Sequence, residues 1–207
     1  MTGYKSLKKA LTDVENATML KLKVTKQTLP DEICKLVNLE TLYLQSETLE
    51  YFPAPFSQLI NLKNLYITSL SLQSIPEIIL SLPKLETLNL AGSNINNFEL
   101  GIGKIIYLKT LFINKNQLTN LPTNIEHLES LTTLSLSDNL LTKFPESLFN
   151  LVGLKKLSLD RNKLTALPLQ RIKSWESLSQ ISLDGNLFSA IEKDNIQQEL
   201  GYHFGSV

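Results

Sequence analysis

The sequence predicts a right-handed solenoid of stacked coils with a parallel β-sheet along one face. The first observation is a leucine that recurs at a nearly constant interval, at Leu39, Leu62, Leu85, Leu108, Leu131, Leu154 and Leu178. The second is the phrase Leu-x-x-Leu-x-Leu that these leucines open, with Ile in some places. A fixed period of about 20 to 29 residues that contains this phrase indicates stacked repeats, in which each coil contacts only its neighbours.

The first part of each coil is predicted to be a short strand. In the coil that begins at Leu108, Leu111 and Ile113 fall on one side and Phe112 on the other, because side chains alternate along a strand. One strand per coil then pairs in parallel with the next. At a spacing of about 4.8 Å, about eight strands give a sheet roughly 35–40 Å long.

An asparagine is expected to support the turn after each strand. The column comprises Asn116, Asn139, Asn162 and Asn186. An amide both donates and accepts hydrogen bonds, so a buried column of amides can satisfy backbone groups that the turn leaves open. In the earlier coils the same position is taken by Glu47, Leu70 and Ser93. This difference predicts a less regular, more mobile N-terminal half.

The second part of each coil is predicted to return along the convex side. Pairs such as Leu121-Pro122 and Phe144-Pro145 begin this return. Proline suits the first position of a helix, where its missing N–H costs nothing. Ile125 and Leu128 then follow at i, i+3, which predicts one or two helical turns with one face toward the interior.

These copies resemble the leucine-rich repeat family, in its 23-residue intracellular form. The resemblance rests on the copies that begin at Leu108, Leu131 and Leu154, and it covers roughly residues 17–191. It implies an α/β horseshoe with a parallel concave sheet, short helical or 3-10 convex segments, and helical caps at both ends.

A single leucine-rich repeat domain is therefore predicted over the whole chain. Its parts are an N-terminal helical cap at residues 1–16, about eight repeats at 17–190, and a C-terminal cap and tail at 191–207. No segment is left to hold a catalytic domain, so we expect no enzyme activity and no cofactor.

Both predicted caps are read from apolar spacing. Leu7, Ala10, Leu11 and Val14 fall on one face of an amphipathic helix over about residues 6–16. At the other end, Ile191, Ile196 and Leu200 suit a helix that stops at Gly201.

Composition argues against several classes of partner. The net charge is zero, with 20 basic and 20 acidic side chains. Nucleic-acid binding and general attraction to anionic membranes normally need a basic excess, so neither is expected.

The chain is expected to be a monomer, with weak self-association left open. Apolar side chains that look exposed on the convex side are Ile106, Tyr107, Phe149 and Val152.

Location is predicted from the cysteine content and the apolar runs. Cys34 is the only cysteine, which excludes a disulfide within the chain and fits a reducing compartment. The segment from Met1 to Asn16 contains no apolar run of secretory length. No stretch approaches the roughly 18 apolar residues that span a bilayer. A cytoplasmic location is expected, with non-classical export as a bacterial effector left open.

Few residues suggest chemistry. Cys34 is expected to be a packed thiol, because no histidine lies near it in sequence to activate it. Trp175 takes a slot that leucine fills in other coils, so we expect it in the core. Asp160 and Asp184 share a position on neighbouring coils and could bridge a cation, but Arg161 beside them favours a solvated surface without a metal.

The concave face can be assigned from the alternation. The outward residue of each strand is, in order, Lys21, Tyr43, Tyr66, Asn89, Phe112, Ser135, Ser158 and Ser182. Aromatic rings that face outward on a rigid sheet suggest an interface. The structural alternative is that Tyr43 and Tyr66 stack on each other across adjacent strands, and both interpretations can hold.

Two other columns add to this face. Glu40, Lys63, Glu86 and Lys109 alternate in sign and are expected to form a lateral ladder of ion pairs. Farther along, charged residues replace the aromatic ones. The predicted partner-binding residues are Tyr43, Tyr66, Asn89, Phe112, Asn64, Lys115, Asp138, Lys156, Asp160 and Arg161.

The predicted function is non-enzymatic recognition of a partner protein through the concave face. The resemblance implies an adaptor, a signalling regulator or a bacterial host-interaction protein. One alternative is recognition of a carbohydrate or small ligand, which aromatic rings beside Asn64, Asn89 and Asn114 would suit. A third is a recognition subunit of an enzyme whose catalytic domain lies elsewhere.

Overall fold

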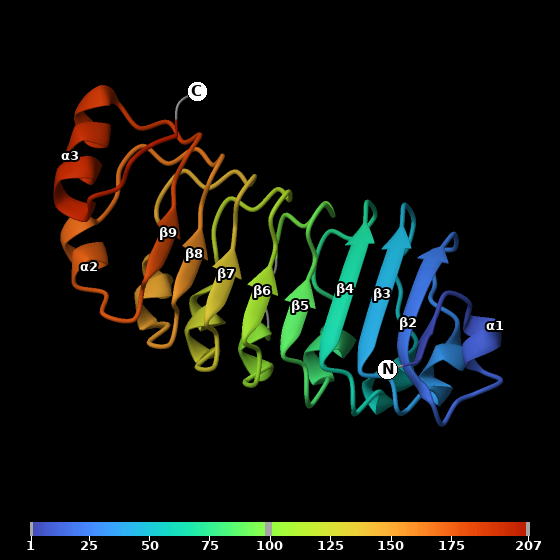
Figure 1. Cartoon of the computed structure of the whole chain (residues 1–207). Coiled ribbons are helices and arrows are strands. Elements are labelled where there is room, and N and C mark those ends of the chain that lie inside the picture. The colour runs from blue at the N-terminus through green and yellow to red at the C-terminus, as the bar shows by residue number, and fades with distance from the viewer. Residues whose placement is uncertain (1, 98–100, 206–207) are drawn as a thin grey trace.

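The computed structural model describes residues 2–97 and 101–205. Within these residues nine strands form one open sheet in chain order, and every neighbouring pair is parallel (Figure 1). The strands are β1 (Thr2–Tyr4), β2 (Ala17–Val24), β3 (Thr41–Ser46), β4 (Asn64–Ser69), β5 (Thr87–Asn89), β6 (Thr110–Phe112), β7 (Thr133–Ser135), β8 (Lys156–Ser158) and β9 (Gln180–Ser182). Parallel crossovers of this kind are right-handed, and the predicted leucine-rich repeat solenoid is confirmed.

Short helical segments return the chain along the other side of the core (Figure 1). The 3-10 segments are η1 (Asp31–Lys35), η2 (Ala54–Gln58), η3 (Glu77–Ser81), η4 (Ile102–Lys104), η5 (Thr123–His127) and η6 (Glu146–Asn150). The enlarged coil that begins at Leu154 carries an α-helix instead, α2 (Leu169–Lys173). Proline directly precedes most of these segments, as at Pro122 with φ −68°. The proline therefore fixes where each return begins.

The core is one continuous cluster between the sheet and the return segments. The inward leucines of the central strands are fully buried, for example Leu88, Leu111 and Leu134. Each such leucine stabilises the fold by roughly 1.5–3 kcal/mol relative to an exposed side chain. Burial repeats at the same place in every coil, so the leucine period sets the register of the whole sheet.

The predicted asparagine column is present in the C-terminal half. Asn139 is 3% exposed, and its Oδ1 accepts a hydrogen bond from the backbone N–H of Leu118 at 3.0 Å. Its Nδ2 donates to the backbone oxygens of Ile113 and Leu136, both at 2.9 Å. Asn116 and Asn162 repeat this pattern in their own coils. The amides therefore tie each coil to the preceding one inside the core.

The N-terminal half differs from the prediction. At the position of the asparagine column Glu47 and Leu70 are exposed and Ser93 is buried, whereas Ser46 and Ser69, the last residues of β3 and β4, are buried one position earlier. The Oγ of Ser46 accepts from the N–H of Leu49 at 2.9 Å, and the Oγ of Ser69 donates to the Leu49 oxygen at 2.6 Å. β3 and β4 contain six residues, whereas β5 to β8 contain three. This half of the sheet is thus its most extended part.

The two ends are closed in different ways. The N-terminal helix α1 spans only Leu7–Ala10, shorter than the helix expected over residues 6–16, and β1 precedes it as an additional strand. The C-terminal helix α3 (Ala190–Leu200) ends at Gly201, whose φ of 64° is left-handed, as predicted. Ile196 of α3 is buried, but Ile191 is 75% exposed and faces solvent instead of the core. The start of the predicted N-terminal cap and the end of the predicted tail lie outside the described residues.

Candidate partner-binding face

The register of the sheet places the predicted concave residues side by side. Lys21 lies opposite Tyr43, Tyr43 opposite Tyr66, and Tyr66 opposite Asn89. Asn89 in turn lies opposite Phe112, and serines continue the row. Tyr43 and Tyr66 are half-buried, in contrast to the fully buried leucines on the other face. The alternation read from the sequence therefore locates this row correctly.

Tyr43 and Tyr66 form a stacked pair. Their ring centroids lie 4.4 Å apart and the ring planes differ by 10°. Burial raises the pKa of Tyr66, and the neighbouring Tyr43 raises it further. Both observations agree with the expected stacking across strands. The pair is held by two six-residue strands, so its position in the sheet is rigid.

Two adjoining hollows lie at this end of the concave face. One, of about 240 Å³, is lined by Lys21, Tyr43, Tyr66 and Asn89, among other residues. The other, of about 410 Å³, is lined by Lys23 and by residues near the C-terminal ends of β3 and β4. They share lining residues of both strands and therefore form one hollow region beside the tyrosine pair.

Phe112 does not join the tyrosine pair. Asn89 of β5 lies between Tyr66 and Phe112 in the row. Two strand spacings separate the two aromatic residues by about 10 Å along the sheet. The aromatic surface therefore consists of a stacked pair and one separate ring.

Asn64, also predicted to bind, lies at the start of β4, where its Nδ2 donates to Thr41 Oγ1 at 3.3 Å.

The charged residues predicted for the other end lie mostly at the edge of the sheet. Lys115, Asp138 and Arg161 have φ angles of 57°, 57° and 50°, and each directly precedes a buried asparagine of the column. This left-handed turn takes the chain out of the strand. Their side chains therefore rim the concave face at the ends of the strands. Lys156, by contrast, is the first residue of β8 and is exposed.

Asp138 and Arg161 form a two-point ion pair between adjacent coils. Arg161 Nε donates to Asp138 Oδ1 at 2.5 Å, and Nη2 donates to Oδ2 at 2.8 Å. The guanidinium holds the pKa of the Asp138 carboxyl below its usual range. Across the residues that the structure places, no carboxylate lies within ion-pair distance of Lys115 or Lys156. Of the predicted binding residues at this end, these two lysines are therefore available to pair with a partner.

The stacked aspartates are held by protein donors. Asp160 Oδ1 accepts from the Ser182 hydroxyl and from the N–H of Asp184 at 2.9 Å. Asp184 Oδ1 accepts from the N–H of Gly205 at 3.1 Å. In the described ranges, no three His, Cys, Asp or Glu side chains are grouped closely enough to hold a metal ion. Asp160 is therefore held by the last repeat, and Asp184 by the tail that follows α3.

The predicted ladder of alternating charges forms two separate pairs. Lys63 Nζ lies 3.4 Å from Glu40 Oε1, and Lys109 Nζ lies 2.9 Å from Glu86 Oε2. The side chains are about half-exposed, so each pair stabilises the fold by roughly 0–1 kcal/mol. These residues help to fix the register and contribute little to a binding site.

Trp175 and the exposed apolar residues lie on the return side. Trp175 is 9% exposed and packs 5.1 Å from Phe149, as expected of a core residue. Ile106, Tyr107 and Val152 are exposed as predicted. Phe149 is covered by Arg171, whose guanidinium lies 4.0 Å from the ring centroid, so it is not an exposed residue.

Among the residues that are described, no helix has the length and apolar character needed to cross a bilayer.

Cys34 is buried, and burial raises the pKa of its thiol to about 11. An ordinary thiol has a pKa of 9.0, so the thiolate fraction at pH 8 is expected to be about 100-fold lower than in the unfolded chain. A thiol reagent at pH 8 should therefore modify Cys34 at least about 100-fold more slowly in buffer than in denaturant. Equal rates under the two conditions would show an accessible, reactive thiol. Absorbance of the released chromophore from a disulfide reagent measures both rates.

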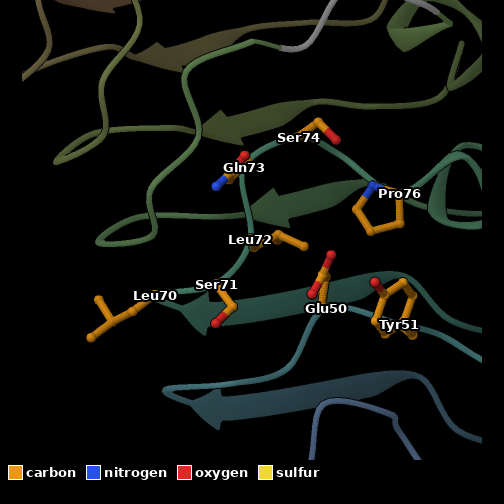
Figure 2. Close-up of a pocket in the computed structure, with 8 residues that line it drawn as sticks. All are labelled: Glu50, Tyr51, Leu70, Ser71, Leu72, Gln73, Ser74 and Pro76. Atoms are coloured by element: carbon orange, nitrogen blue, oxygen red, sulfur yellow. The ribbon is translucent and has the colours of Figure 1, made fainter.

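A further hollow lies outside the predicted concave row and has no signal in the sequence. It encloses about 570 Å³ on the return side, between Glu50 and Tyr51 of one coil and the segment 70–76 of the next (Figure 2). The hollow lies between two coils, and the repeat period in the sequence does not reveal such a gap.

Comparisons with known proteins agree with this geometry. A family model described as leucine rich repeat matches residues 106–164 and 129–188. The structure is similar to an internalin, InlF, from Listeria monocytogenes, with a TM-score of 0.69 and 21% identity over 91% of this chain and 54% of that one. It is also similar to internalin C2 from the same organism, with a TM-score of 0.70 and 24% identity over 87% of this chain and 76% of that one. The chain thus spans about half of the InlF structure. No curated protein matches the sequence.

Proposed function

Because the chain is a leucine-rich repeat protein, we propose that it is a non-enzymatic interaction module that binds a partner protein on its concave face. The observation that carries this proposal is the stacked pair Tyr43–Tyr66 beside the joined hollows on the longest strands. Tyrosine offers a large contact area with little side-chain entropy to lose, which makes it frequent at the centres of interfaces.

The two ends of the face would contribute differently to binding. At the tyrosine end, burial of ring and aliphatic surface supplies affinity. At the other end, Lys115 and Lys156 carry charges without an ion-pair partner among the described residues. Charges at the rim of an interface mainly set orientation and association rate. A cytoplasmic adaptor, a signalling regulator and a bacterial host-interaction protein would all use such a preformed face.

The test is affinity capture from native lysate with the triple variant Tyr43→Ala/Tyr66→Ala/Phe112→Ala. We expect the captured partner to bind at least about 100-fold more weakly, because central aromatic residues typically contribute about 1–2 kcal/mol each to binding and three are removed. Titration of the purified partner by calorimetry measures the change. The matched control is Ile106→Ala/Tyr107→Ala/Val152→Ala, which removes exposed apolar side chains outside the concave row.

Circular dichroism should show that both variants keep the native fold. If every captured protein binds the aromatic triple variant as well as the native chain, the concave proposal is wrong. It is equally wrong if the control variant loses the partner and the aromatic variant keeps it.

Recognition of a carbohydrate is the second candidate, supported by Asn64 and Asn89 beside the tyrosine pair. Sugars bind to aromatic rings by stacking on an open ring face. In this structure each tyrosine turns one face toward the other tyrosine, at 4.4 Å, which reduces the ring surface open to a sugar. This geometry favours a protein partner. A thermal shift with oligosaccharides that disappears in the aromatic triple variant would reverse that preference.

A further inference from the structure

A second line of backbone hydrogen bonds joins the coils on the return side. The N–H of Glu50 donates to the oxygen of Gln27 at 2.8 Å, and the N–H of Asn96 donates to the oxygen of Gln73 at 3.1 Å. Each bond joins equivalent positions of two successive coils. In the C-terminal coils the bonds have donors two residues earlier and acceptors one residue earlier in the repeat, from Gln117 to Ile95, Leu140 to Leu118, Lys163 to Leu141 and Leu187 to Leu164.

Within the described residues this line is interrupted once. Among the described coils, only those that begin at Leu39 and Leu62 lack such a bond, because the N–H of Gln73 does not donate to the oxygen of Glu50 and no nearby backbone bond replaces it. Neither group has another protein partner among the described residues. The coils remain joined nearby, since the Ser71 hydroxyl donates to the Glu47 oxygen at 3.0 Å. The gap therefore begins beyond Ser71 and is local.

The 570 Å³ hollow lies at this interruption. Figure 2 shows Glu50 and Tyr51 on one side, with the segment from Leu72 through Gln73 to Pro76 passing on the other. The volume is within the range of about 300–1,000 Å³ that is typical of ligand sites. Two aromatic rings, Phe52 and Phe56, fill the interior of the adjoining coil, with their centroids 5.2 Å apart.

The walls of the hollow specify the chemistry of an occupant. One wall offers a backbone acceptor, the Glu50 oxygen, and the other offers a backbone donor, the Gln73 N–H. A peptide unit carries one donor and one acceptor and can therefore satisfy both groups. Among the described lining residues, Glu50 is the only one with a charged side chain. At the rim, Tyr51 is 54% exposed and Leu70 is 52% exposed, so apolar surface is available as well.

We propose that this hollow binds a short extended segment of a partner protein that carries a lysine or arginine. Its backbone would replace the missing bond between the two coils, in the way that an added strand completes a sheet edge. Its cation would pair with the Glu50 carboxylate, and a neighbouring apolar side chain would cover Tyr51 and Leu70. The site adjoins the hollow at the C-terminal ends of β3 and β4 through Leu70, but Glu50 and Gln73 lie outside the concave row, and the proposal does not depend on the function proposed above.

The test is a nuclear magnetic resonance titration of the 15N-labelled full chain with the capped peptide acetyl-Thr-Lys-Val-Thr-amide. We expect saturable shifts of the Tyr51, Gln73 and Ser74 amides, and slower hydrogen exchange at the Gln73 amide when the peptide is bound. A peptide with glutamate in place of lysine should bind at least about fivefold more weakly. A peptide with N-methylated backbone amides should lose most of its affinity, because it can no longer donate.

Two variants locate the site. Ser74→Trp fills the hollow and should abolish the shifts, whereas Asn120→Trp makes the same change at the equivalent exposed position two coils farther on and should leave them intact. Glu50→Gln should remove the preference for lysine over glutamate. Thermal unfolding checks that each variant is folded, and Tyr43→Ala/Tyr66→Ala should bind the peptide normally.

The proposal is wrong if the Gln73 amide does not shift, or if the shifts map to the concave residues. It is also wrong if the lysine and glutamate peptides bind equally, or if Asn120→Trp weakens binding as much as Ser74→Trp. A small organic amide that binds while the peptide does not would assign the hollow to a small ligand and overturn the polypeptide assignment.

Discussion

Replacing Asn139 with alanine is expected to lower the free energy of unfolding by about 3 kcal/mol. The Asn139 amide is 3% exposed and hydrogen-bonds to the backbone of Leu118, Ile113 and Leu136. Alanine leaves these backbone groups without a partner in an interior where water cannot replace it. Urea unfolding followed by circular dichroism measures the loss, which should appear as a lower midpoint with an unchanged slope.

The matched control for this prediction is Asn186→Ala at the C-terminal end of the same column. Asn186 makes equivalent bonds to Leu164, Leu159 and Leu183, but it is only half-buried, so water can reach part of the site. We expect a loss of less than half that of Asn139→Ala. An Asn139→Ala variant as stable as the native chain would show that the column does not hold the coils together.

Replacing Phe56 with alanine is expected to cost about 4 kcal/mol, the largest effect of a single substitution predicted for this chain. The Phe56 ring is completely buried and packs edge-on against Phe52. Removing it loses the transfer free energy of the ring and leaves a cavity that neighbouring leucines fill only in part. Chemical unfolding in urea or guanidinium measures the difference.

Phe56→Leu is the control, because leucine keeps most of the volume and the apolar character. We expect it to cost about 1.5 kcal/mol. If alanine and leucine destabilise the chain equally, the volume of the ring does not contribute to stability.

The sequence predicted the sheet and its concave row because a fixed period determines both. Since one full period separates Tyr43 from Tyr66, the two residues must lie on adjacent strands. The alternation of side chains then places both on the outer face. The asparagine column follows from the same period, since Asn116, Asn139 and Asn162 occupy one position in successive coils.

Other features depend on contacts of individual side chains and backbone groups, which the repeat period does not reveal. A serine hydroxyl can support the turn one position earlier than an amide, so the period assigned Glu47 and Leu70 where the structure uses Ser46 and Ser69. The left-handed backbone of Asp138 moves its carboxylate from the floor of the face to its rim. The hollow at Glu50 lies where no backbone hydrogen bond joins two coils, and the period does not show which of these bonds is absent.

Because the strands are evenly stacked, the distance between two residues on the concave face follows from the number of strand intervals between them. From β4, which carries Tyr66, to β8, which carries Lys156, there are four strand intervals. At about 4.8 Å each they amount to about 19 Å. A compact loop tip can therefore reach the tyrosine pair or the lysine, but only a ligand with an elongated ridge can engage both at once.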